Sequence, residues 1–155
     1  MSKNDAIARQ IAALPVRWDK EKRLRLLMVT SRDTGRWVMP KGWLMDGRKP
    51  WLAAEIEALE EAGAVGAISK VAIGRYHYLK QLGDGAAVLC RVTVYPMTVE
   101  KLKRNWKERG QRQRHWFSPR EAARLVEEGE LSELLLGLTE APKRRRIIAG
   151  MRKAP

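Results

Sequence analysis

The chain has 155 residues, with 31 Lys and Arg against 18 Asp and Glu, and a formal net charge of +13 at pH 7. This length suits one domain that buries about two-thirds of its unfolded surface, and the hydrophobic content of 45% excludes a disordered chain. The charge is compatible with three anionic partners: nucleic acid, a membrane surface or a heavily phosphorylated small molecule. No apolar run is long enough to span a bilayer, and the first ten residues lack the apolar segment of a signal peptide. We therefore expect a cytoplasmic protein without a membrane partner.

The first half of the chain predicts three strands and one helix. Residues 9–17 and 24–32 are expected to form strands joined by a charged turn, and residues 36–39 a short strand. Pro50 suits the first turn of the helix that follows, and Gly63 suits its end.

The second half predicts a hairpin, a strand and two helices. Residues 67–80 and 86–97 read as long strands around a turn, and residues 111–117 as a further strand. Ser118 and Glu121 have the spacing of a capping box, which opens a helix that we expect to end near Gly129. A last helix is expected from about residue 140 to 148. With no repeat or linker, the pattern predicts a single α/β domain.

The most informative feature is a group of three glutamates in the helix that ends at Gly63. Glu57, Glu60 and Glu61 are spaced i, i+3 and i+4, which at about 100° per residue places them on one helix face. Crowded like charges destabilise a helix by a few tenths of a kcal/mol, so the group is a candidate site for a hard divalent cation. The alternative is the solvated face of an amphipathic helix.

The segments around these glutamates resemble the Nudix box, the 23-residue loop–helix–loop signature of the Nudix hydrolases. Counted from Gly42, the matching positions are Ala58, Ala64, Gly63 and the three glutamates. Two positions depart from the signature: Arg48 stands where the first box glutamate is expected, and Ile56 stands where the box arginine is expected. In the family these two side chains typically pair and brace the loop against the helix, so the departure removes one structural ion pair. Arg48 is left to pair with Asp46 or Glu55 instead.

Two further segments, 26–42 and 112–126, are similar to the diphosphoinositol polyphosphate and diadenosine polyphosphate branch of that family. The resemblance covers about residues 9–126 and is carried by Ser31, Arg32, Trp37, Arg112, Arg114, Trp116 and Phe117. It implies an α/β/α sandwich with a mixed β-sheet. We accordingly expect a single Nudix hydrolase domain over residues 1–155, with a core of about 9–138 and a basic C-terminal helix of about 139–155.

The resemblance also implies the roles of the site residues. The catalytic set is Glu57, Glu60 and Glu61, which together with the carbonyl of Gly42 would hold Mg²⁺ or Mn²⁺. The substrate-binding candidates are Arg9, Ser31, Arg32, Lys41, Arg112 and Arg114, because guanidinium and ammonium groups suit phosphate oxygens. One of two tryptophans near the box, Trp43 or Trp51, is a candidate wall for a nucleotide base.

We therefore predict a metal-dependent hydrolase that cleaves a phosphoanhydride bond in a small polyphosphorylated substrate, of the diadenosine or diphosphoinositol polyphosphate class. The turn at 80–85 holds one lysine and one aspartate, which weighs against an inositol substrate. One alternative is a pyrophosphohydrolase acting on nucleotides or an RNA 5′ end. The other is a catalytically weak Nudix-fold domain that binds phosphorylated ligands or RNA.

Overall fold

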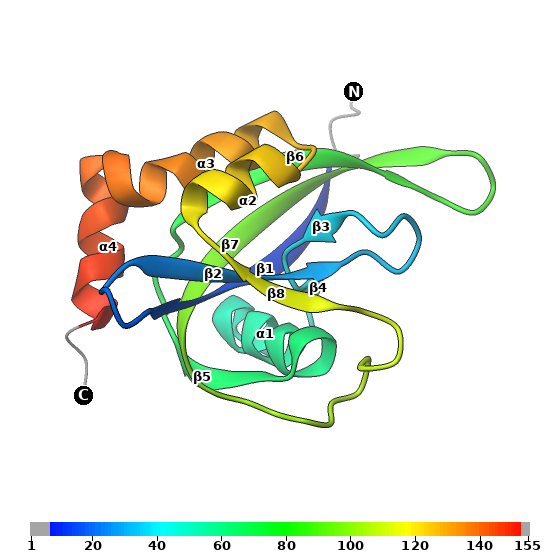
Figure 1. The fold of residues 1–155 in the computed structure, drawn as a ribbon. Helices are drawn as coiled ribbons and strands as arrows, with labels where there is room; N and C mark the ends of the chain where they lie inside the picture. Colours follow the sequence, from blue (N-terminus) through cyan, green and yellow to red (C-terminus); the bar gives the residue numbers. More distant parts are fainter. Residues whose placement is uncertain (1–6, 153–155) are drawn as a thin grey trace.

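The computed structural model describes residues 7–152, which form one mixed sheet with helices on both faces (Figure 1). The strands are β1 (Ala8–Trp18), β2 (Leu24–Thr30), β3 (Trp37–Val38), β4 (Lys41–Trp43), β5 (Ala64–Ile68), β6 (Gly74–Gln81), β7 (Ala87–Leu102) and β8 (Arg114–Phe117). The helices are α1 (Pro50–Glu57), its π-helical continuation η2 (Ala58–Ala62), α2 (Pro119–Leu125), α3 (Gly129–Glu140) and α4 (Pro142–Arg152). The sheet has the order β3-β2-β1-β7-β5, with β4 paired to β1, β6 to β7 and β8 to β2.

Strand β1 lies in the middle of the sheet and is buried on both of its faces. Ile11 and Ala13 pack in a core cluster with the helix α1–η2, whereas Ala12, Leu14 and Val16 pack with α2, α3 and α4. A strand covered on both faces becomes a continuous apolar run, which explains why residues 11–16 are all buried. The expected α/β/α sandwich with a mixed sheet is confirmed.

The long strand β7 organises the second half of the sheet. It runs parallel to β1, from Ala8 opposite Cys90 to Val16 opposite Thr98. Its first part pairs with β6 in an extended hairpin, and its last part pairs with β5. In Figure 1 the tip of this hairpin projects beyond the body of the domain.

The prediction of one continuous strand over residues 67–80 was wrong. Residues up to Ile68 belong to β5, and the chain turns before β6 begins at Gly74. The hydroxyl group of Ser69 stabilises this turn, because it accepts a hydrogen bond from the Val71 N–H at 3.0 Å and donates one to the Val71 carbonyl at 2.9 Å. The two short strands can therefore pair with different parts of β7.

The helical region contains one helix more than the sequence predicted. The capping box is present: the Glu121 N–H donates to Ser118 Oγ at 3.1 Å, and the Ser118 N–H donates to Glu121 Oε1 at 2.9 Å. The helix that it opens ends at Leu125 rather than near Gly129. Gly129 instead begins α3, whose buried leucines 131, 134, 135 and 138 cover the sheet. None of the helices within residues 7–152 has the length and apolar character needed to cross a membrane.

Candidate functional site

A pocket of about 480 Å³ opens between the box helix (α1 with its continuation η2), the β6–β7 hairpin and the loop that follows β2. Seven of the predicted site residues line it: Ser31, Arg32, Lys41, Gly42, Glu57, Glu61 and Arg112. Three others do not line it: Arg9, Glu60 and Arg114. The fold thus brings both ends of the box, the loop after β2 and the segment that holds Arg112 into one cavity.

Two carboxyl groups, those of Glu57 and Glu61, lie next to each other in this pocket. Burial, the interaction with Glu61 and the repulsion of nearby acids raise the pKa of Glu57 to about 8. Burial also raises the pKa of Glu61, against the opposing effect of the Arg112 guanidinium. Glu61 is 7% exposed, and its Oε1 accepts a hydrogen bond from the Lys41 N–H at 3.3 Å. A cation bound at this pair would stabilise the charged form of both carboxyl groups.

The π-helical turn explains why Glu60 does not join this pair. Hydrogen bonds in a π-helix run from residue i to i+5, so each turn holds about one residue more than an α-helical turn. Glu61 then follows Glu57 by nearly a full turn, whereas Glu60 falls short of it. The Glu60 carboxylate lies 3.6 Å from Lys107 Nζ instead. Within residues 7–152, no group of three or more histidine, cysteine or acidic side chains is placed to hold a metal ion.

Gly42 is packed directly against the Glu57 carboxylate. A Cβ atom at Gly42 would collide with both carboxylate oxygens of Glu57. The absence of a side chain at this position therefore lets the β4 backbone approach the acid. Backbone and carboxylate oxygens are the donors that Mg²⁺ and Mn²⁺ prefer, so the donor set of Gly42, Glu57 and Glu61 fits a hard divalent cation.

Arg112 is held in a buried network next to the carboxyl pair. Its Nε lies 2.6 Å from Glu108 Oε1, its Nη1 donates to the Thr30 carbonyl at 3.0 Å, and its Nη2 lies 3.7 Å from Glu61 Oε2. The side chain is 9% exposed. Glu108 also lines the pocket and was missed by the sequence analysis, because it lies in an irregular loop and belongs to no recognisable motif.

Arg114 stabilises the end of the box helix. Its Nη1 donates to the Ala62 carbonyl at 2.8 Å, and its guanidinium lies 3.9 Å from the centroid of the Trp106 ring. The Trp106 indole N–H in turn donates to the Glu61 carbonyl at 3.1 Å. Gly63 has a φ of 65°, which ends the helix at the predicted residue and leaves its Cα against these two side chains. Arg9 is exposed on β1, away from the pocket.

The open part of the pocket combines cationic and apolar side chains. Arg32, Lys41 and Lys80 supply positive charge, whereas the Arg36 guanidinium lies 3.7 Å from Glu127 and 3.8 Å from Glu128. Burial lowers the pKa of Lys41. Trp43 and Leu79 line the same pocket and are 48% and 63% exposed.

The other candidate tryptophan, Trp51, packs edge-on against Tyr95 with ring centroids 6.5 Å apart. Trp51 thus lies on the side of α1 that packs against the core. Of the two tryptophans near the box, only Trp43 therefore faces the pocket.

The two departures from the box leave the loop without the expected brace. Arg48 is exposed, and within the described residues it forms no ion pair, so the alternative partners Asp46 and Glu55 are not used. Ile56 is half-buried on α1.

Comparisons with known proteins agree with this architecture, although no family model matches the chain. The Arabidopsis thaliana protein named Nudix hydrolase 12, mitochondrial, is 30% identical over 110 residues, which cover 69% of this chain and 54% of that protein. The chain thus spans about half the length of this curated relative. Diphosphoinositol polyphosphate phosphohydrolase 3-alpha of Homo sapiens is 29% identical over 125 residues, covering 79% of this chain and 71% of that protein.

Solved structures show the same fold. A Caenorhabditis elegans Ap4A hydrolase in a binary complex has a TM-score of 0.65 and 18% identity, and the match covers 92% of this chain and 98% of that one. The Nudix domain of Shewanella oneidensis NrtR, solved with ADP ribose, has a TM-score of 0.64 and 12% identity, covering 90% and 88%. Taken with the box residues around the Glu57–Glu61 pair, these similarities show that the chain belongs to the Nudix superfamily.

Proposed function

We propose that the chain is a Mg²⁺- or Mn²⁺-dependent hydrolase that cleaves a phosphoanhydride bond in a small polyphosphorylated substrate. The observation that carries this proposal is the pair of neighbouring carboxyl groups, Glu57 and Glu61, in a pocket that also holds several cationic side chains. A binding domain has no need to bury two acids side by side, because burial raises the pKa of both carboxyl groups, a cost that a bound cation would offset.

Within this proposal, Gly42, Glu57 and Glu61 hold the metal, and Glu60 is the third carboxylate by resemblance. When bound, the cation would neutralise phosphate charge and lower the pKa of an attacking water. One carboxylate of the set accepts the proton of that water. Arg32, exposed at the mouth of the pocket, binds phosphate oxygens.

Lys41 and Lys80 add point charges to the same wall of the pocket. Arg112 orients Glu61 through the 3.7 Å contact and is itself fixed by Glu108. Its role is thus to position a carboxylate, besides any contact with a phosphate.

The walls of the pocket favour a dinucleoside polyphosphate over a diphosphoinositol polyphosphate. Trp43 and Leu79 offer exposed aromatic and aliphatic surface on which a nucleotide base can stack. The tip of the β6–β7 hairpin carries Lys80 and Asp84, so their formal charges cancel there. An inositol ring bearing phosphates on all sides would require a more basic wall.

The proposal is tested by measuring phosphate or nucleotide release from a panel of substrates with Mg²⁺ or Mn²⁺. The panel holds diadenosine polyphosphates, diphosphoinositol polyphosphates, nucleoside diphosphate derivatives and 5′-triphosphate RNA. We expect metal-dependent turnover of a diadenosine polyphosphate. Glu57→Gln and Glu61→Gln should each lose more than the about 10- to 100-fold typical of an outer-shell partner. Glu60→Gln should lose less, because the π-helical turn directs Glu60 to Lys107.

A second candidate function is binding of phosphorylated ligands or RNA without turnover. The unbraced loop around Arg48 and the position of Glu60 outside the pocket favour it. Tight binding of a diadenosine polyphosphate with no turnover in either metal would support this function and contradict the hydrolase. Binding of RNA through many phosphates would weaken steeply between low and physiological salt. A cytoplasmic location stays a prediction, and the names of the A. thaliana relatives carry the word mitochondrial.

A further inference from the structure

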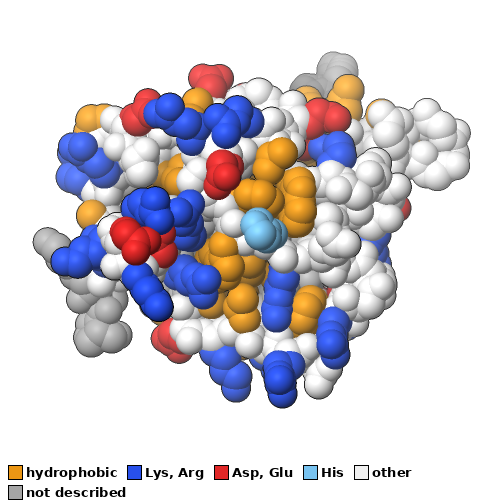
Figure 2. Space-filling view, viewed as in Figure 1, with side chains coloured by type: hydrophobic (Ala, Val, Ile, Leu, Met, Phe, Trp, Pro, Cys, Tyr) orange, Lys and Arg blue, Asp and Glu red, His pale blue; other side chains and the backbone are white. Residues whose placement is uncertain are grey.

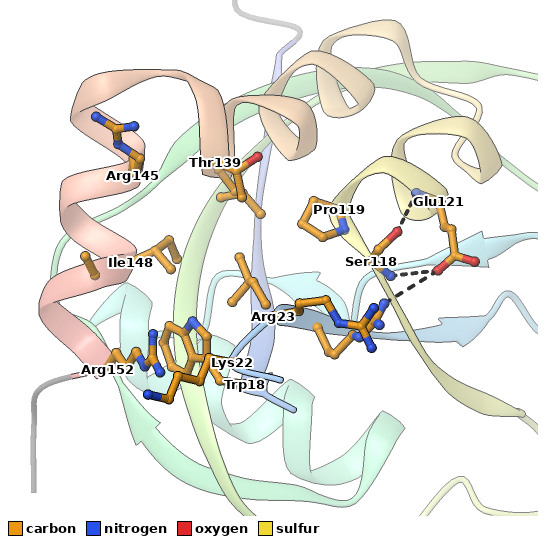
Figure 3. A pocket seen from close by; sticks show the side chains of 14 residues that line it. Trp18, Lys22, Arg23, Ser118, Pro119, Glu121, Thr139, Arg145, Ile148 and Arg152 are labelled. Atoms are coloured by element: carbon orange, nitrogen blue, oxygen red, sulfur yellow. Dashed lines mark hydrogen bonds and ion pairs between the residues drawn. The ribbon is translucent and has the colours of Figure 1, made fainter. Parts of the chain in front are cut away.

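A second and larger cavity, of about 660 Å³, lies between the β1–β2 turn, the start of α2 and the ends of α3 and α4 (Figure 3). It shares no lining residue with the pocket of the carboxyl pair. Its apolar lining consists of Trp18, Leu24, Pro119, Leu138, Ile148 and Ala149. The volume falls within the range of about 300–1,000 Å³ that is usual for sites of small organic ligands.

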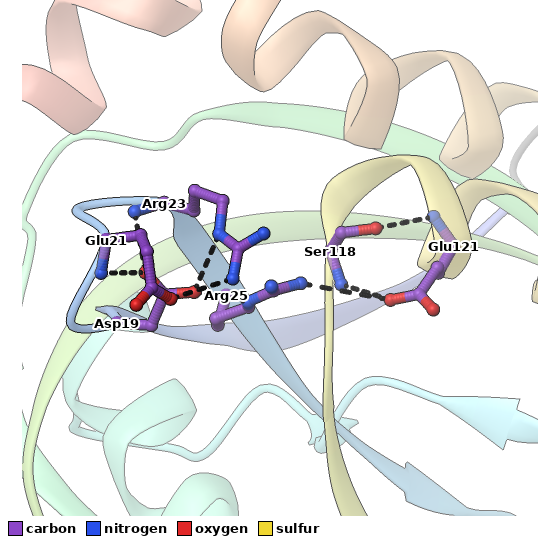
Figure 4. Close-up of polar contacts among 6 residues, drawn as sticks. All are labelled: Asp19, Glu21, Arg23, Arg25, Ser118 and Glu121. Carbon is purple, nitrogen blue, oxygen red and sulfur yellow. Dashed lines mark hydrogen bonds and ion pairs between the residues drawn. The ribbon is translucent and has the colours of Figure 1, made fainter.

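Five cationic side chains line this cavity, and two of them are neutralised by acids of the chain. Arg23 and Arg25 each place Nε 3.1 Å from Asp19 Oδ2, and Arg23 also contacts Glu21 at 2.9 Å. Glu121, the acid that lines the cavity, caps α2 through Ser118 and lies 3.9 Å from Arg25 (Figure 4). These contacts form a closed network and leave no acid directed at the other three cations.

The three remaining cations are Lys22, Arg145 and Arg152. None of them forms an ion pair with any residue in the range 7–152. The Arg152 guanidinium lies 5.6 Å from the centroid of the Trp18 ring, and Figure 3 shows Trp18, Lys22 and Arg152 together on one side of the cavity. On the face shown in Figure 2, Lys and Arg side chains gather over α4 and the β1–β2 turn. The cavity therefore combines an aromatic and aliphatic lining with unneutralised positive charge at its edge.

The backbone at Lys22 is held in an uncommon conformation. Its φ is 64°, the only positive value among the non-glycine residues of the described part. The turn is fixed by a hydrogen bond from the Lys22 N–H to the Asp19 carbonyl and by one from the Asp19 N–H to the Arg23 carbonyl, both 2.9 Å long. A lysine in this region costs free energy that a glycine would not, and here it places an ammonium group at the edge of the cavity.

We propose that this cavity is a second ligand-binding site for a small organophosphate with a planar apolar body, of the nucleoside monophosphate class. The phosphate would bind the Arg152 guanidinium and the Lys22 ammonium group, which lie together beside Trp18 in Figure 3, whereas Arg145 lies toward the other end of α4. The planar body would lie against Trp18 and the aliphatic lining. Because the two pockets are separate, this proposal does not depend on the hydrolase activity.

Adenosine monophosphate is the appropriate probe, because it contains no phosphoanhydride bond for the first pocket to cleave. Titration calorimetry on the full chain in EDTA should show saturable 1:1 binding. Adenosine lacks the phosphate and inorganic phosphate lacks the planar body, so each should bind at least about tenfold more weakly than adenosine monophosphate. The affinity should fall as salt is raised, because the contacts at the edge are ionic.

Matched variants locate the site. Arg152→Ala should weaken binding by about tenfold, whereas Arg146→Ala, which removes another exposed arginine of α4 that does not line the cavity, should leave it unchanged. Lys22→Gly should weaken binding while preserving thermal stability, since glycine accepts the positive φ. A Glu57→Gln/Glu61→Gln double variant should bind the probe like the wild type.

Three results would overturn the proposal: no saturable binding at millimolar probe, equal losses in Arg152→Ala and Arg146→Ala, or inorganic phosphate binding as tightly as the nucleotide. Loss of binding in the Glu57→Gln/Glu61→Gln variant would equally overturn it, because the probe would then occupy the first pocket. Each of these outcomes leaves the turnover assay of the proposed hydrolase unaffected.

Discussion

Replacing Gly42 with alanine should separate metal binding from stability. The atoms that a methyl group would meet at this position belong to the carboxylate of Glu57, the far end of a flexible side chain, so the β4 backbone need not move. A shift of the Glu57 side chain costs about 0.5–1.5 kcal/mol. The loss of unfolded-state freedom from glycine to alanine returns about 0.4–1 kcal/mol. The free energy of unfolding should therefore change by less than about 1 kcal/mol.

The carboxylate that is pushed aside can no longer lie beside Gly42 and Glu61. We expect the affinity for Mn²⁺ to fall by about 10- to 100-fold, as when the environment of a metal ligand is disturbed. Calorimetric titration with Mn²⁺ measures the affinity, and thermal unfolding of the metal-free protein measures the stability. Gly83→Ala is the matched control, because nothing lies within 4 Å of a Cβ at that position. Wild-type Mn²⁺ affinity in Gly42→Ala would refute the assignment of Glu57 and Gly42 to one cation site.

Three further predictions concern stability. Gly66→Ala should destabilise the fold by about 1–3 kcal/mol in urea unfolding, because a Cβ there would collide with a backbone carbonyl of β7; an unchanged midpoint would contradict the close pairing of β5 with β7. Ser118→Ala should cost about 0.5–2 kcal/mol at pH 7. The Ser118 backbone N–H, which alanine keeps, is the largest cause that lowers the pKa of Glu121, and the Ser118 side chain is the next. The side-chain part is present above the ordinary value of 4.5 and is lost as the pH falls through the lower folded value; a loss that is equal at pH 7 and pH 3 would exclude this part. Leu135→Ala should cost about 2–5 kcal/mol, whereas Leu136→Ala, which truncates an exposed leucine of α3, should cost far less; equal unfolding midpoints in the two variants would show that α3 does not cover the core.

Elements with local signals were predictable from the sequence. The capping box at Ser118 and the stop at Gly63 are set by residues that act on their own backbone, and both are present where expected. The continuous apolar run in β1 likewise reflects burial on two faces, and its bounds are close to those predicted.

Elements that depend on distant partners were not predictable in the same way. The break between β5 and β6 follows from the length of β7, which has room to pair with two strands. Helix α3 was missed because its leucines follow Gly129, which reads as a helix end when the covering sheet is not considered.

The candidate site likewise has parts with a local sequence signal and parts that depend on distant residues. The box motif and the flanking segments located the pocket, since seven of the predicted residues line it. The π-helical turn that separates Glu60 from Glu57 and Glu61 has no local sequence signal, and the side chains that contact this helix end, Trp106 and Arg114, lie far along the chain. Glu108 has no sequence signal either, because it lies in an irregular loop outside any recognisable motif.

The parallel pairing of β1 with β7 has a consequence for how the chain folds. The first residues of this ladder, Ala8 and Cys90, are joined only after about eighty intervening residues have been synthesised. A sheet whose central contact closes so long a loop has a high contact order, which predicts folding in milliseconds to seconds rather than microseconds. Until β7 is complete, the apolar edge of β1 is exposed, so this strand is the segment of the nascent chain most in need of protection from aggregation.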